Sequence, residues 1–374
     1  MEGLLYLEDG SVYRGKGFGH AATNVGELVF NTSMAGYQGI LTDPSYKGQI
    51  INMTYPLIGN YGVNEVENQS GRIHAFGFVT RDITFRPSNR MSVMSISEWL
   101  EQQGIPGIYN VDTRAITKKI RVEGTIKSVI SNEGISKEEA KKLIEETSLR
   151  TDYMREVGVR ENKVYPGVPD GVSGKGLKIA VLDFGIKRSI IKGLNRLGCE
   201  AVLFPYGATA EDILAIKPDG LLLSNGPGDP EACELGIKTA RDLIGKLPIF
   251  GICMGHQVIA LAMGGTTYKL KYGHRGANHG VKNIYSDRSV ITSQNHSFAV
   301  EADSVTDKGM IITHYNLNDN TVEGMKHKEL PIFSVQYHPE GSPGSNDSYG
   351  LFDRYVTMVN SVNEGTWKDG AVHA

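Results

Sequence analysis

Cysteine is scarce in this sequence, with only Cys199, Cys233 and Cys253 among 374 residues. Three scattered thiols cannot build a disulfide framework, and no C-x-x-C pair or H-E-x-x-H motif is present to hold a metal. The amino terminus has no basic region followed by an apolar run, and no stretch reaches the ~18 apolar residues of a membrane helix. We therefore expect a cytoplasmic, soluble, reduced protein with no metal site and no membrane partner.

An excess of charge of either sign is also lacking. Lys and Arg total 39 against 42 Asp and Glu, a formal charge of −3, which gives no electrostatic reason to expect nucleic acid. Neither phosphate-loop pattern, G-x-x-x-x-G-K-[ST] or G-x-G-x-x-G, occurs. Glycine, in contrast, is abundant: 45 residues are about 12%, against a usual ~7%, which indicates many tight turns.

At roughly 150 residues per domain, the length suggests two or three domains. In residues 1–165 a hairpin is expected around Asp9-Gly10, and Ser136 with Glu139 forms a capping-box pattern before a charged helix. These elements follow no strand–helix–strand rhythm, so the sequence predicts an α+β domain. The segment 165–176 contains six Gly or Pro in twelve residues and is interpreted as a linker.

Residues 177–366 have a different pattern of apolar residues from that of the first half. Continuous apolar runs at 179–182, 220–223 and 248–252 are each followed by a turn or a helical pattern. Buried strands alternating with helices predict an α/β domain with an open, mostly parallel sheet. In such sheets the functional residues lie in loops at the carboxyl ends of the strands.

The sharpest motif is Gly251-Ile-Cys-Met-Gly255, preceded by a buried run and followed by a helical pattern. It is the Gly-x-nucleophile-x-Gly elbow with Cys253 as nucleophile. Glycine on both sides lets the chains pack closely, and the helix amino terminus favours the thiolate. The alternative is a small buried cysteine beside chance glycines. Cys199 and Cys233 lack this setting and are interpreted as structural or incidental.

A thiolate that attacks a carbonyl needs a partner that handles protons, and Tyr337-His-Pro-Glu-Gly341 offers one. His338 would be the base or acid, and Glu340 would orient its imidazole. The alternative is a polar surface turn. His256 and His296 compete for the role of His338, and spacing alone does not choose among them.

A third motif, Asn225-Gly-Pro-Gly-Asp229, follows the run 220–223. Gly226 and Gly228 allow close backbone approach, and an N–H there could stabilise an oxyanion together with the N–H of Met254. The alternative is a type II turn with a purely structural role.

The glycine turn, the elbow and the HPE segment, in this order along the chain, resemble the class I (triad-type) glutamine amidotransferases over about 190 residues, 177–366. The first half carries VFNTSMAGYQ at 29–38, LTDPSY at 41–46, TYPLIGN at 54–60 and NVDTRAI at 110–116. These segments resemble the amino-terminal domain of the small-subunit family of carbamoyl-phosphate synthetases. The resemblance then spans nearly the whole chain.

The resemblance implies that the chain hydrolyses L-glutamine and passes ammonia to a large synthetase subunit in a heterodimer. That partner would bind ATP and Mg²⁺ and use bicarbonate; this chain itself would hold no cofactor. Cys253 would form a glutamyl thioester, His338 would transfer protons, and Glu340 would hold His338. The residues implied to bind glutamine are Ser45, Gly226, Gly228, Met254, Gln257, Asn295, Ser297 and Phe298. Ser297 stands where the family usually has glycine.

Two alternatives stay open at the level of sequence. One is another amidotransferase glutaminase, such as that of anthranilate or GMP synthesis, which would lack the first-half segment around Ser45. The other is a non-catalytic regulator, which would be expected to lose Cys253 or His338, and both are present. The product would serve arginine or pyrimidine synthesis, and the sequence does not choose between them.

Overall fold

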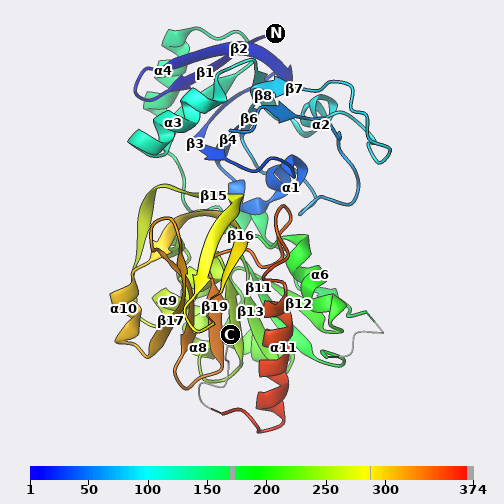
Figure 1. Ribbon diagram of the computed structural model, residues 1–374, viewed down its shortest axis with the longest axis vertical. Helices are drawn as coiled ribbons and strands as arrows, with labels where there is room; N and C mark the ends of the chain where they lie inside the picture. Colours follow the sequence, from blue (N-terminus) through cyan, green and yellow to red (C-terminus); the bar gives the residue numbers. More distant parts are fainter. Residues whose placement is uncertain (169–172, 287, 369–374) are drawn as a thin grey trace. The chain divides into compact units, whose positions relative to one another are not determined.

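The computed structural model describes residues 1–168, 173–286 and 288–368. The chain forms two compact units: Met1–Arg150 with Lys271–Gly276, and Thr151–Leu270 with Ala277–Ala374 (Figure 1). The division falls after Arg150, ahead of the segment 165–176 predicted as linker, of which residues 169–172 lie outside the described residues. None of the described helices has the length and apolar character needed to cross a membrane.

The first unit is built on a closed barrel with the strand order β1-β2-β8-β6-β4-β3-β9. Its strands are β1 (Glu2–Leu7), β2 (Val12–Gly19), β3 (Thr23–Asn31), β4 (Gln49–Met53), β5 (Leu57–Ile58), β6 (Gly77–Val79), β7 (Asp82–Ile83), β8 (Pro106–Tyr109) and β9 (Ile126–Ser131). Its helices are α1 (Tyr37–Thr42), η1 (Pro44–Tyr46), α2 (Ile96–Gln103), α3 (Thr113–Glu123) and α4 (Lys137–Glu146). The predicted hairpin is confirmed as β1–β2, and the predicted capping box of Ser136 and Glu139 begins α4.

The pairing inside the barrel differs from the expectation in one respect. β3 pairs with β4 in parallel, with α1 and η1 between them, and β6 pairs in parallel with β8, with β7 and α2 between them. The expectation of no strand–helix–strand connection in the first half is therefore wrong. All six residues of α1 are buried, so this helix shows no amphipathic pattern that sequence reading could detect.

The second unit contains one ten-stranded sheet with the order β10-β12-β11-β13-β14-β19-β18-β17-β15-β16. Its strands are β10 (Lys163–Tyr165), β11 (Lys178–Asp183), β12 (Glu200–Pro205), β13 (Gly220–Leu223), β14 (Ile249–Ile252), β15 (Thr267–Asn283), β16 (Ser289–Val300), β17 (Met310–Asn316), β18 (Val322–His327) and β19 (Ile332–Val335). Its helices are α5 (Met154–Val157), α6 (Arg188–Arg196), α7 (Ala210–Ala215), η2 (Pro230–Ala232), α8 (Glu234–Leu243), α9 (Met254–Ala262), α10 (Ala302–Thr306) and α11 (Gly350–Asn363).

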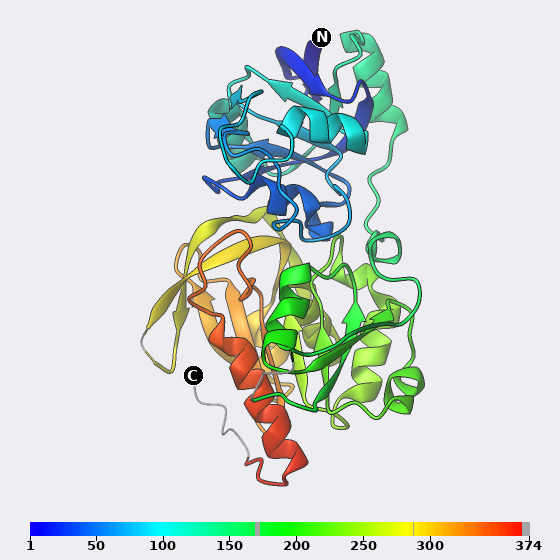
Figure 2. The same cartoon turned by 90° about the vertical axis from the view of Figure 1, so that its right-hand side faces the viewer.

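Five neighbouring strands of this sheet, β12, β11, β13, β14 and β19, run parallel. Three of them, β11, β13 and β14, correspond to the predicted apolar runs. The described pairs beyond β19 are antiparallel, an extension that the sequence analysis did not anticipate. Helices cover both faces. One apolar cluster packs α6 and α11 against the sheet, and another packs α7, α8 and α9 against it. Figure 2 shows α6 in green beside α11 in red.

Candidate active site

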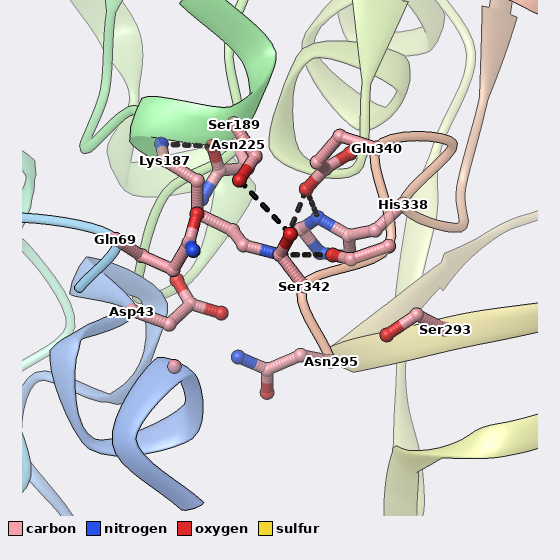
Figure 3. A network of polar contacts seen from close by, with 12 residues as sticks. Asp43, Gln69, Lys187, Ser189, Asn225, Ser293, Asn295, His338, Glu340 and Ser342 are labelled. Atoms are coloured by element: carbon pink, nitrogen blue, oxygen red, sulfur yellow. Dashed lines mark hydrogen bonds and ion pairs between the residues drawn. The ribbon is translucent and has the colours of Figure 1, made fainter. Parts of the chain in front are cut away.

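The segments that carry the predicted chemistry follow the carboxyl ends of neighbouring parallel strands. β11 ends at Asp183, β13 at Leu223, β14 at Ile252 and β19 at Val335. Because parallel strands end at the same edge of a sheet, the elbow, the glycine turn and the HPE segment lie together at that edge. Figure 3 shows polar side chains at this edge, among them Lys187, His338 and Glu340.

The backbone at Cys253 is strained. Its φ of 55° and ψ of −103° lie outside the regions that a residue with a side chain normally adopts. The predicted reason for the flanking glycines is confirmed: a Cβ on Gly251 would lie 2.7 Å from the Gly255 carbonyl oxygen, and one on Gly255 would lie 2.1 Å from that of Leu223. The thiol is 2% exposed and donates to the carbonyl oxygen of Asn295 at 3.5 Å. This is the turn that a nucleophile elbow requires.

His338 and Glu340 form a buried pair. Nδ1 of His338 lies 2.7 Å from Oε1 of Glu340, and both side chains are almost fully enclosed. The backbone N–H of His338 also donates to the carbonyl oxygen of Ser293 at 2.9 Å, which connects the HPE segment to β16. Nε2 is buried without a regular hydrogen bond among the described residues, although the Cys253 thiol is close enough to affect the ring electrostatically. The ring is therefore oriented by Glu340 through one nitrogen and has the other available for chemistry.

Lys187 completes this buried array, and sequence reasoning did not identify it. Its Nζ lies 2.9 Å from Oε1 of Glu340 and donates to the carbonyl oxygen of Gly341 at 2.7 Å. Its backbone N–H donates to Oδ1 of Asn225, so the residue joins the loops after β11 and β13. Its position just after a buried strand was the signal that could have singled it out, because functional side chains gather there.

The three charges set the protonation of the array. Burial alone would raise the pKa of Glu340, but the Lys187 ammonium and the His338 ring hold that pKa at about 2. Burial lowers the pKa of His338 and Lys187 does the same, but Glu340 and the Cys253 thiol outweigh both, and the pKa is raised to about 10. At neutral pH the array therefore contains a carboxylate and an imidazolium, which can donate a proton to a leaving amine.

The glycine turn has a packing reason as well as the predicted functional one. A Cβ on Gly226 would lie 2.5 Å from the Phe184 carbonyl oxygen, and one on Gly228 would lie 2.0 Å from that of Thr151. Gly228 also has a φ of 94°, which favours glycine. Met254 is the first residue of α9, where helix N–H groups have no partner inside the helix. A role for these N–H groups at an oxyanion stays a prediction.

The segment 294–298 and Gln257 are joined by hydrogen bonds. Nε2 of Gln257 donates to the Phe298 carbonyl oxygen at 2.9 Å and to Oε1 of Gln336 at 3.0 Å. Asn295 is buried, and Ser297 and Phe298 are half-buried. Ser45, in contrast, belongs to the first unit, where it is buried in η1 and its N–H donates to Oδ1 of Asp43. The assignment of these residues to glutamine binding stays a prediction.

The competing residues have other surroundings. Burial raises the pKa of both Cys199 and Cys233 to about 12, which suits inert structural thiols. His256 is fully buried with Nδ1 2.9 Å from Oγ of Ser334, and burial lowers its pKa to about 3. His296 is engaged through both ring nitrogens. His338 differs from the other two in facing a carboxylate on one side and the elbow thiol on the other.

Comparison with known families agrees with this geometry. Residues 180–358, within the second unit, match the family Glutamine amidotransferase class-I, so the second unit belongs to that class of protein. Residues 5–130 match the CPSase domain of the carbamoyl-phosphate synthase small chain. The chain is 54% identical over 358 residues to the carbamoyl phosphate synthase small chain of Clostridium acetobutylicum, covering 96% of this chain and 100% of that one.

Two further relatives align as completely. The small chain of Bacillus caldolyticus is 44% identical over 374 residues, covering 100% of both chains. The carbamoyl phosphate synthase pyrimidine-specific small chain of Bacillus subtilis is 44% identical over 370 residues, covering 99% of this chain and 98% of that one. The chain therefore belongs to the carbamoyl phosphate synthase small chain family.

Proposed function

We propose that this chain hydrolyses L-glutamine to glutamate and ammonia as the small subunit of a glutamine-hydrolysing carbamoyl-phosphate synthase. The observation that carries the proposal is the strained elbow at Cys253 beside the buried His338–Glu340 pair. Residues 5–130 match the family to which the first-half segments were compared, so another amidotransferase glutaminase is not favoured. A non-catalytic regulator is not favoured either, because the thiol and the imidazole are both present.

The reaction follows from the roles of three groups. Transfer of the thiol proton to Nε2 of His338 gives a thiolate and an imidazolium. The Cys253 thiolate attacks the carboxamide carbon and forms a carbon–sulfur bond, while the N–H groups of Met254 and the glycine turn stabilise the oxyanion. Nε2 of His338 gives its proton to the leaving nitrogen, the carbon–nitrogen bond breaks, and ammonia departs from a glutamyl thioester. His338 then takes a proton from water, whose oxygen displaces the sulfur to give glutamate.

Glu340 acts through His338 and not on the substrate. It fixes the ring so that Nε2 faces the sulfur, and its negative charge favours the imidazolium. The residues that we assign to glutamine binding are Ser45, Gly226, Gly228, Met254, Gln257, Asn295, Ser297 and Phe298. A backbone contact at Ser297 would be the same as that of a glycine there, so the hydroxyl is not required for it.

The family name implies a large partner chain. We propose that this large synthetase subunit binds ATP and Mg²⁺ and combines the ammonia with bicarbonate in a heterodimer. Pyrimidine synthesis is the favoured use of the product, since one relative is named pyrimidine-specific, and arginine synthesis stays a second proposal. The cytoplasm stays the predicted location.

The test of the proposal is Cys253→Ser in the complex with the large subunit. A hydroxyl is a far poorer nucleophile than a thiolate, so release of ammonia from glutamine should be abolished. Synthesis of carbamoyl phosphate from added ammonium should persist, because that chemistry belongs to the partner. Cys233→Ser, the same change at a buried thiol with a raised pKa, is the control and should keep glutaminase activity. Glutamine hydrolysis by Cys253→Ser at the wild-type rate would refute the assignment.

A further inference from the structure

A cavity of about 420 Å³ lies in the second unit at the amino-terminal end of α11. Its lining comes from the end of β15, from β16 and β17, from Tyr337 and from the first turns of α11. The volume falls in the range of small-molecule sites, about 300–1,000 Å³. None of its described lining residues belongs to the set assigned above to catalysis or glutamine binding.

Arg354 brings a positive charge to this cavity. The residue is half-buried on α11, and its Cζ lies 4.9 Å from the centre of the Phe333 ring, a cation–π contact that holds the group in place. Burial lowers the pKa of Arg354 to about 10, so the group is charged at neutral pH. A guanidinium group presents its donors in a planar fork that matches a carboxylate or a phosphate. Arg288 adds a second, exposed guanidinium to the lining.

Two further basic residues, on the paired strands β17 and β18, lie within the electrostatic influence of Arg354. Burial and then the charge of Arg354 lower the pKa of His314 to about 4, and the same two causes lower the pKa of Lys326. An anion beside Arg354 would oppose both shifts, because a nearby negative charge favours the protonated form of a base. Binding of an anion would therefore be favoured by three basic groups at once.

Asp347 is the acidic residue among the described lining residues. Its carboxylate accepts from Oγ of Ser345 and from the N–H of Ile291, and these bonds lower its pKa. The side chain is exposed, whereas Arg354 is half-buried, so water and salt screen the carboxylate more than the guanidinium. Asp347 therefore does not cancel the attraction of the cavity for an anion.

Neutral polar and aromatic groups complete the lining. The Tyr337 hydroxyl is hydrogen-bonded to the side chain of Ser348, and burial raises the pKa of Tyr337, so the hydroxyl keeps its proton. The His314 ring packs edge-on against the Tyr337 ring, with 5.9 Å between their centroids. Tyr337 directly precedes His338, so a ligand in the cavity would contact the segment that carries the acid–base group.

We propose that this cavity binds a small organic anion, whose phosphate or carboxylate group pairs with the Arg354 guanidinium, and that its occupancy alters glutamine turnover through Tyr337. A few converging polar groups beside aromatic faces are the usual composition of a small-molecule site. The binding part of the proposal is independent of the proposed function, whereas the effect on turnover rests on it.

Gly350 allows a charge to be placed in the cavity without a clash. It is the first residue of α11 and lines the cavity, and a Cβ built on it meets no atom within 4 Å. Gly350 and Arg354 are four residues apart and therefore adjacent on one helix face. Gly350→Asp adds a carboxylate that competes with the ligand, and an acidic residue in the first turn favours the helix, so this variant should fold. Gly350→Asn, of the same shape without the charge, is the matched control.

Binding is measured by isothermal titration calorimetry of the full chain with inorganic phosphate and, separately, with malonate at constant ionic strength. We expect wild type and Gly350→Asn to bind with a Kd of about 1 mM or lower, and Gly350→Asp at least about tenfold more weakly. Tighter binding of phosphate would indicate a phosphate-bearing ligand, and tighter binding of malonate a carboxylic acid. Equal affinity in the two variants, or no saturable binding to wild type below about 10 mM of either anion, would overturn the proposal.

The effect on turnover is measured as ammonia release from glutamine by the complex, where any contribution of the partner chain is the same in both variants. Saturating anion should change kcat at least about twofold in Gly350→Asn and leave it unchanged in Gly350→Asp. The same response in both variants would overturn the effect through Tyr337. If the wild-type complex does not hydrolyse glutamine, the proposed function fails, while calorimetry still decides whether the anion site exists.

Discussion

Replacement of Lys187 by methionine tests the buried array most directly. Methionine has a side chain of similar length and no charge, so the change removes the ammonium while retaining most of the apolar contacts. Two charge-assisted hydrogen bonds disappear, to Oε1 of Glu340 and to the carbonyl oxygen of Gly341. Glu340 then keeps His338 as its remaining charged partner.

The magnitude follows from these two bonds. Removing one partner of a buried ion pair costs about 3–5 kcal/mol, and we expect the lower end, about 3 kcal/mol, because His338 still compensates Glu340. In catalysis we expect about a hundredfold loss in kcat/KM for glutamine, or about 2.7 kcal/mol at 1.36 kcal/mol per tenfold. The reason is that Glu340 loses the largest influence that keeps it ionised despite burial, and with it the ability to orient His338.

The pH dependence of stability and activity provides an independent test of the role of Lys187. In the wild type the pKa of Glu340 is lowered from 4.5 to about 2, so the stability that its charge contributes is fully present above pH 4.5 and is lost as the pH falls toward about 2. Without Lys187 the pKa of Glu340 rises, and both the stability and the activity should be lost at a higher pH than in the wild type.

The assay is release of ammonia from glutamine by the complex across pH 4–8, with thermal denaturation of the same samples. Lys192→Met is the matched control, since Lys192 is exposed on the same helix α6 and should change neither readout. Glutaminase activity within threefold of wild type in a stably folded Lys187→Met protein would refute the reasoning.

Five further substitutions follow from the same geometry. His338→Asn should lose glutamine hydrolysis almost completely, and Glu340→Gln should lose less of it, because the carboxylate acts through the ring. A larger loss of turnover in His296→Asn than in His338→Asn would mean that the roles assigned to these two histidines must be exchanged. Ser297→Gly should leave glutamine kinetics nearly unchanged, and a loss beyond about tenfold would show that the hydroxyl contributes. Gly255→Ala should lower the free energy of unfolding by about 1–3 kcal/mol in denaturant titrations despite alanine's higher helix propensity, because its Cβ would meet the Leu223 carbonyl oxygen; a stabilised variant would contradict this clash.

Local patterns predicted much of the second unit. The runs 179–182, 220–223 and 248–252 became β11, β13 and β14, because fully buried parallel strands are written as continuous apolar segments. The elbow was recognisable because its glycines have a local steric cause. The placement of Cys253 and His338 at one sheet edge then follows from the parallel order of the strands that precede them.

The rest depends on contacts between segments far apart in sequence. The sequence around Lys187 predicts only the start of a helix. The contact of its ammonium group with Glu340, 153 residues later, is formed by the fold. The antiparallel strands β15 to β18 were not identified from the sequence, and their pairing is set by neighbours along the sheet. The hydrogen bond between Gln294 and Glu323 is likewise invisible to spacing, because its members come from two strands of that extension.

β19 joins two regions of the sheet, since it pairs in parallel with β14 and antiparallel with β18. The nucleophile follows β14, whereas His338 follows β19 and is bonded to Ser293 in the antiparallel region. Local opening between β14 and β19 would separate the acid–base group from the sulfur. Catalysis thus depends on the pairing of β14 with β19, two strands that lie far apart in the sequence. The rate of amide hydrogen exchange along β19 is therefore a closer measure of the catalytically competent population than the helical circular-dichroism signal of the whole chain.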